Sequence, residues 1–151
     1  MEMTFSVSNL AKSLANYLGE YFPNVTFYED PVQQLTDVPC MFLQTRTTNI
    51  SLKTSDRYLR TLGLDLVYLE NYDLPNLQRL YQSAIEILDE HLETFPYSDG
   101  TDTCLLRAYD RKSNVDEDSA HYNFELRLWV HAPESGIPMQ SLTYQEEILN
   151  E

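Results

Sequence analysis

The stretch LRTLGLDLVYL, residues 59–69, decides the fold of this chain. Its apolar residues recur at every second position, which is the period of a β-strand with one buried face. The stretch YNFELRLWV, residues 122–130, has the same alternation near the end of the chain. Together they predict a sheet with one face turned to a core, formed by Leu62, Leu64, Leu66 and Tyr68 on the first strand and by Tyr122, Phe124, Leu126, Leu128 and Val130 on the second.

Two segments have apolar residues at helical spacing and can cover that face. The first spans residues 8–22, with Ser6 or Thr4 as a candidate N-cap. The second opens at Asp73 and continues through residues 74–95, ending before a proline. Their amphipathic stripes predict two helices packed on the same face of the sheet.

Two hairpins are expected to supply the strands. The first pairs residues 40–49 with residues 57–69 through a polar tip that has nothing to bury at its centre. The second pairs residues 103–111 with residues 121–131 through a polar loop. We therefore expect an α+β fold, a single domain whose mainly antiparallel or mixed sheet is built from two hairpins, with two amphipathic helices on one face.

The length of 151 residues and a hydrophobic content of 42% suit one domain with a substantial core. We expect this domain to span residues 1–132, with a short strand at residues 25–28. After residue 132 the composition changes, and residues 133–151 are expected to form a tail or a docking arm.

The net charge of −14, from 24 acidic and 10 basic residues, argues against specific binding of nucleic acid or of an anionic membrane surface. No apolar run approaches the roughly 20 residues of a membrane span, and the first residues do not have the order of a secretion signal. We expect a protein folded in a cytoplasm. Cys40 and Cys104 fall in strand-like segments and are expected to be buried and reduced.

A search for chemistry predicts no catalytic, cofactor or metal site. The four glycines form no phosphate-binding turn, and the three histidines lack metal-ligand spacing. The acidic run at residues 116–118 lacks the alternating ligands of a calcium loop and is interpreted as a solvated turn. No nucleophile motif is present, so we expect a protein that is not an enzyme.

Two surfaces are candidate interfaces. On the sheet face opposite the core, Arg127 and Trp129 are either part of an ordinary solvated face or anchors for a neighbouring subunit, because Trp and Arg are enriched at interfaces. The second candidate is the polar tip of the first hairpin, which comprises Ile50, Ser51, Leu52, Lys53, Thr54, Ser55 and Asp56.

The order of these segments resembles the tail terminator, or tail completion, proteins of long-tailed bacteriophages that infect Gram-positive hosts. The resemblance covers roughly residues 5–132 and has no catalytic signature. It is carried by a helix ending in YFPN (21–24), by PCMFLQ (39–44), by RYLRTLGLDLVYLEN (57–71), by LQRLYQSAIEILDEHLE (77–93) and by the final strand YNFELRLWV (122–130).

The resemblance implies a structural virion protein that caps the tail tube as a homo-oligomer, a hexameric ring, stops tube polymerisation and joins the head or neck connector. It implies no cofactor. The partners would be further copies of the chain, the tail tube protein and a neck protein. Two alternatives stay open: another neck or head-completion connector, and a small host-directed binding domain with a closed apolar pocket.

Overall fold

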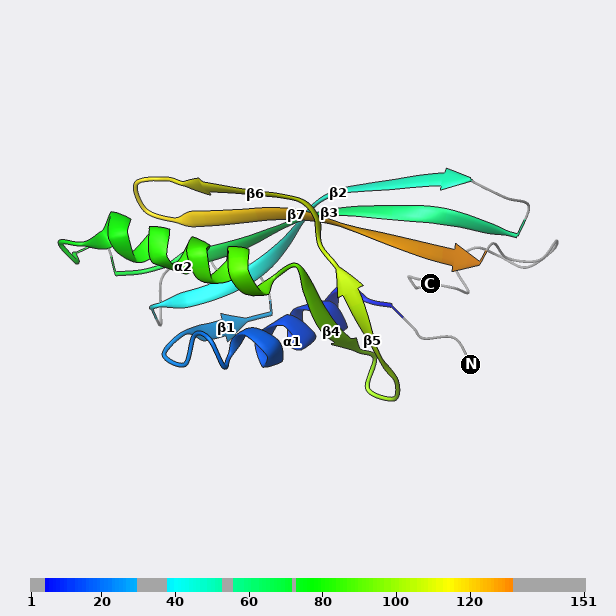
Figure 1. Ribbon diagram of the computed structural model, residues 1–151, viewed down its shortest axis with the longest axis horizontal. Coiled ribbons are helices and arrows are strands. Elements are labelled where there is room, and N and C mark those ends of the chain that lie inside the picture. The colour runs from blue at the N-terminus through cyan, green and yellow to red at the C-terminus, as the bar shows by residue number, and fades with distance from the viewer. Residues whose placement is uncertain (1–4, 30–37, 53–55, 72, 132–151) are drawn as a thin grey trace.

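The computed structural model describes residues 5–29, 38–52, 56–71 and 73–131. A five-stranded sheet in the order β1-β2-β3-β7-β6 lies over two helices and a separate two-stranded sheet, β4-β5 (Figure 1). The elements are α1 (Val7–Leu18), β1 (Thr26–Tyr28), β2 (Cys40–Leu52), β3 (Arg57–Leu69), α2 (Leu77–His91), β4 (Thr94–Ser98), β5 (Thr103–Arg107), β6 (Tyr109–Val115) and β7 (Ala120–His131).

The register of the main sheet confirms the predicted core face. β3 pairs antiparallel with both β2 and β7, placing Leu62 opposite Leu126. β1 pairs parallel with β2, so the sheet is mixed. The alternating apolar residues of β3 and β7 belong to one core with the helix side chains Leu14 and Ile85, except that Leu128, expected in the core, is only partly buried at its edge. The expected α+β class with both helices on one face is confirmed.

The predicted start of the first helix agrees with the structure, whereas the predicted start of the second does not. Ser6 caps α1, because its Oγ accepts a hydrogen bond from the backbone N–H of Asn9 at 3.1 Å. The second helix begins at Leu77 and not at Asp73. Before it, Asn71 accepts hydrogen bonds from Asp73 and Leu74, and this turn keeps the preceding residues out of the helix.

The helix also ends earlier than expected, because residues 94–98 form β4. Phe95 and Tyr97 are buried at alternate positions of this strand. Pro96 was expected to follow the helix directly, but a proline is compatible with an edge strand. β4 pairs with β5 to form the second sheet.

The predicted second hairpin was wrong in its first strand. The continuous strand expected at residues 103–111 is divided at Ala108: β5 pairs with β4, whereas β6 pairs with β7. Ala108 is buried, and its N–H donates to the carbonyl of Glu93 at 2.9 Å, which fixes the point where the chain changes sheet.

The two cysteines have different environments. Cys40 is buried in the sheet, as expected, but Cys104 is exposed because it lies on β5 of the small sheet. Neither forms a disulfide. Among the described residues, no helix is long and apolar enough to cross a membrane.

Candidate assembly interface

Three strands of the main sheet continue past the helices, as Figure 1 shows at the ends of β2, β3 and β7. We call this part, residues 46–52 of β2, 57–63 of β3 and 125–131 of β7, the sheet extension. It contains most of the predicted interface residues that the structure describes. Ile50, Ser51 and Leu52 were expected in a loop but belong to β2, and Asp56 directly precedes β3. Lys53, Thr54 and Ser55 lie outside the described residues.

A β-bulge determines which side chains share a face of the sheet extension. Thr45 pairs with Leu64 but Thr47 pairs with Gly63, so Arg46 is an extra residue on β2. The bulge shifts the alternation of β2 by one position. As a result Ile50 lies on the core-side face. Residues 45–49 are all polar, so no alternation in the sequence reveals this bulge.

Two large apolar side chains of the sheet extension are exposed, one on each face. Ile50 is 61% exposed on the core-side face, and Trp129 is 56% exposed on the outer face, where it was expected. The guanidinium carbon of Arg57 lies 6.0 Å from the centroid of the Trp129 ring. Exposed apolar groups of this size are typical of surfaces that another protein covers.

Arg127 also lies on the outer face, but its guanidinium already has partners within the chain. Its Nε donates to Glu125 at 3.2 Å, and its Nη2 donates to Asp110 at 3.3 Å. The guanidinium carbon lies 4.0 Å from the centre of the Tyr109 ring. These contacts match the solvated-face interpretation more closely than that of a free anchor, so Trp129 is the stronger interface candidate of the two.

Charge is distributed unevenly between the sheet extension and the rest of the chain. The sheet extension contains four of the ten basic residues, Arg46, Arg57, Arg60 and Arg127, but only one of the 24 acidic ones, Glu125. The region therefore carries a net positive charge in a strongly acidic protein. The sequence contained this signal, which became apparent only when the fold brought the three strands together.

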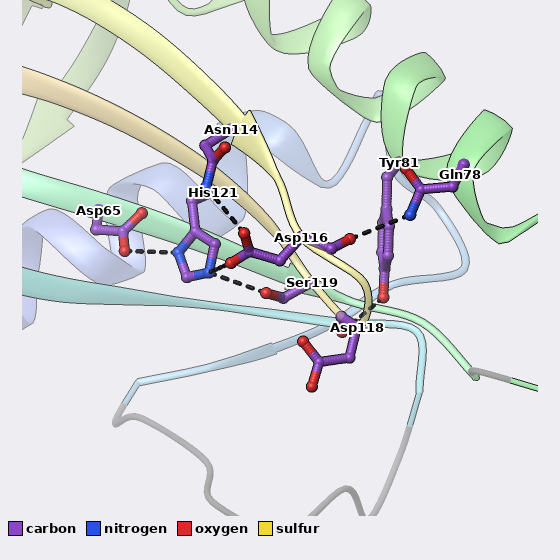
Figure 2. Close-up of polar contacts among 8 residues, drawn as sticks. All are labelled: Asp65, Gln78, Tyr81, Asn114, Asp116, Asp118, Ser119 and His121. Carbon is purple, nitrogen blue, oxygen red and sulfur yellow. Dashed lines mark hydrogen bonds and ion pairs between the residues drawn. The ribbon is translucent and has the colours of Figure 1, made fainter.

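A second polar cluster, which sequence reasoning missed, lies at the opposite end of β7. His121 lies between Asp65 on β3 and Ser119 in the β6–β7 turn (Figure 2). Its Nδ1 is 2.8 Å from Asp65 Oδ2, and its Nε2 is 2.9 Å from Ser119 Oγ. Asp116 Oδ2 is 3.5 Å from the same Nε2. The order of acid, imidazole and hydroxyl is that of a hydrolase triad.

The surroundings of this cluster indicate a structural role. Ser119 is buried, and its carbonyl accepts from the N–H of Asp116 at 2.8 Å within the turn. From α2, Tyr81 donates to the carbonyl of Asp118 at 2.9 Å and Gln78 donates to that of Asp116 at 3.1 Å (Figure 2). The cluster therefore connects the turn to β3 and α2.

Three hollows on the described surface lie away from Ser119 and His121. Hollows of about 430, 570 and 130 Å³ open on the described surface, and neither Ser119 nor His121 lines any of these three. Among the described residues, no group of three or more His, Cys, Asp or Glu side chains could hold a metal ion.

Comparison with known proteins gives one match. A family model described as phage tail terminator protein matches residues 9–137, which is most of the chain. The matched segment contains every strand of both sheets, including the sheet extension. No curated protein matches the chain.

Proposed function

The chain belongs to the phage tail terminator family, and we propose that it caps the tail tube, stops its polymerisation and forms the joint to the head or neck connector. In this role it is a structural component of the virion tail and not an enzyme. It acts as a homo-oligomeric ring, hexameric in our proposal, and needs no cofactor. Residues 133–151, for which we expected a tail or a docking arm, lie outside the described residues.

The sheet extension is the observation that supports this role best. It extends beyond the helices, carries Ile50 and Trp129 in exposed positions, and concentrates the basic residues of the chain. We propose that its tip, residues 50–56, contacts the tube or neck, and that the outer face bearing Trp129 and Arg127 contacts neighbouring subunits. Burial of Trp129 at such a contact would contribute about 2 kcal/mol or more to binding.

Tail assembly in vitro tests the proposal. A chain in which Ile50–Asp56 is replaced by a short Gly-containing turn is expected to keep its circular dichroism spectrum yet fail to arrest tube growth. Electron microscopy should then show overlong or headless tails. A matched control shortens the exposed loop between β4 and β5 at Gly100, which lies outside the sheet extension and should leave tail length unchanged. Normal tails from the tip-replaced chain would contradict the proposal.

Another neck or head-completion connector is the alternative role within the virion. Such a protein would bind the portal side and not the end of the tube. Pull-down of purified chain with tail tubes and with portal-bearing heads separates the two roles, because a terminator should bind tubes in the absence of heads.

A further inference from the structure

The sheet extension leaves two strand edges open, and we infer that these edges join neighbouring copies of the chain by strand addition, β7 of one copy beside β2 of the next. Among the described residues, β2 pairs only with β3 along residues 43–52, and β7 pairs only with β3 along residues 126–131. Unpaired N–H and C=O groups along such edges can pair with another chain. The inference describes the joint between subunits of the proposed ring, and it rests on the proposed function, because a closed ring is what gives every such edge a partner.

The strand directions fix the kind of pairing. β2 and β7 each run antiparallel to β3, so they run in the same direction. Copies in a ring are related by rotation about one axis, and each joint connects unlike edges. The joint between β7 and the neighbouring β2 is therefore parallel, with evenly spaced hydrogen bonds. A twofold dimer would instead pair β2 with β2 antiparallel and leave both β7 edges open.

The composition of the β2 edge favours pairing. Residues 47–52, beyond the bulge, are uncharged and contain no proline, so this part of the edge lacks two of the features that usually prevent strand addition. The nearest cation on β2, Arg46, lies in the bulge and donates to Asn123 at 2.9 Å. Because Arg127 of β7 is bonded to acidic groups of its own chain, little charge repulsion opposes the joint.

The apolar faces also match across the joint. The bulge places Ile50 on the core-side face, which is the face of Leu128 and Val130 on β7. A sheet that continues from one copy to the next keeps the same face toward the same side. The exposed Ile50 of one copy would therefore lie beside Leu128 and Val130 of its neighbour and be removed from water. In the ring, Ile50 at the start of the tip would contact the neighbouring subunit, and the rest of the tip would remain available to the tube or neck.

Cross-links between copies test the direction of this joint. The full chain with Cys104→Ser retains only the buried Cys40. One preparation of this chain carries a cysteine on β2, either Thr47→Cys or Ser51→Cys. A second preparation carries a cysteine on β7, either Arg127→Cys or His131→Cys. The two preparations are mixed and treated with a short thiol cross-linker, once without tail tubes and once with them. A parallel joint links position 47 to 127 and 51 to 131. An antiparallel joint links 47 to 131 and 51 to 127, because four strand residues span about 13 Å.

A charge introduced on the edge of β2 tests whether this strand contributes to oligomer formation. Ile50→Lys should raise the concentration needed for oligomer formation by about tenfold or more, whereas Leu105→Lys, at a leucine that is 72% exposed on β5, should leave it unchanged. Sedimentation measures both variants, and circular dichroism checks that each is folded.

The cross-linking results that would overturn the inference are links in the antiparallel pattern, links between two copies of one β2 variant, and the absence of links both without tubes and with them. Equal assembly of the Ile50→Lys variant and the wild type would also overturn it. Protection of the residue 47–51 amides from hydrogen exchange in dilute monomer would also overturn it, because the edge would then be covered by its own chain. Tails that the wild-type chain fails to cap would instead contradict the proposed function.

Discussion

Leu126 and Arg127 are neighbours on β7 that face opposite sides of the sheet. Leu126 is buried in the hydrophobic core, whereas Arg127 lies on the outer face. Leu126→Ala should lower the free energy of unfolding by about 2 to 5 kcal/mol, through lost burial and the cavity that remains. Arg127→Ala should cost less than about 1 kcal/mol, because its ion pairs and its contact with Tyr109 are exposed to solvent. Urea denaturation of both variants measures the difference, and equal losses would show that the register is wrong.

Tyr122 makes the stability of the domain sensitive to alkali. Burial, and next its hydrogen bond to Asp89, raises the pKa of Tyr122 to about 12. The folded state keeps this hydroxyl neutral, whereas the unfolded chain ionises it near pH 10. The stability that it contributes is therefore fully present below pH 10 and is lost as the pH rises toward 12.

Tyr122→Phe should reduce the loss of unfolding free energy that the wild type shows as the pH rises above 10. The difference in unfolding free energy between the wild type and the variant should shrink by up to about 1.4 kcal/mol per pH unit above pH 10. Burial also raises the pKa of Tyr81 and Tyr97, but these groups remain in both proteins and their effects cancel in the difference. Urea midpoints between pH 9 and 11.5 provide the measurement. Parallel curves for the two proteins would contradict the assignment.

At the scale of elements, the sequence predicted what depends on local periodicity and missed what depends on distant contacts. The alternation in residues 59–69 and 122–130 was sufficient to assign the buried faces, and hence the exposure of Trp129. The change of sheet at Ala108 could not be predicted, because it depends on a hydrogen bond to Glu93 across the fold. The contact between Asp65 and His121 likewise depends on the register of β3 against β7.

Gly63 on β3 lies opposite Thr47, the residue that follows the bulge on β2. A Cβ at Gly63 would lie 2.4 Å from Thr47 Oγ1 but 3.6 Å from Thr47 Cβ. Gly63→Ala should therefore destabilise the wild type by about 1 kcal/mol through a forced rotamer change. In a Thr47→Ala background the clash is absent, and the same change should become neutral or stabilise by about 0.4 to 1 kcal/mol, because the unfolded chain loses entropy.

A double-mutant cycle measured by urea denaturation tests this coupling, since it separates the pairwise term from the two single effects. The control is Gly100→Ala, where φ is +97° and no atom lies near the added Cβ. That change should destabilise through backbone strain, and equally in both backgrounds. Additive effects of the Gly63 and Thr47 changes would show that the two residues are not coupled through this contact.

At the scale of the whole molecule, the charge distribution opposes nucleic-acid binding even though one region is basic. Outside residues 46–63 and 125–131 the chain has 22 acidic and five basic residues. Duplex DNA approaching the sheet extension would also meet the field of this acidic body. Within the extension, Arg46 and Arg127 are already bonded to Asn123, Glu125 and Asp110, so fewer cations can pair with phosphates.

We therefore expect no gel shift of duplex DNA by the purified chain, even at low salt, where contacts between cations and phosphates are strongest. The comparison variant is Glu125→Gln with Asp110→Asn, which removes the carboxylates that hold Arg127 and should make any latent DNA binding easier to detect. A salt-sensitive complex with the wild type, weakened by Lys53→Ala and Arg57→Ala, would contradict the expectation. It would show that the local charge of the sheet extension outweighs the acidic body.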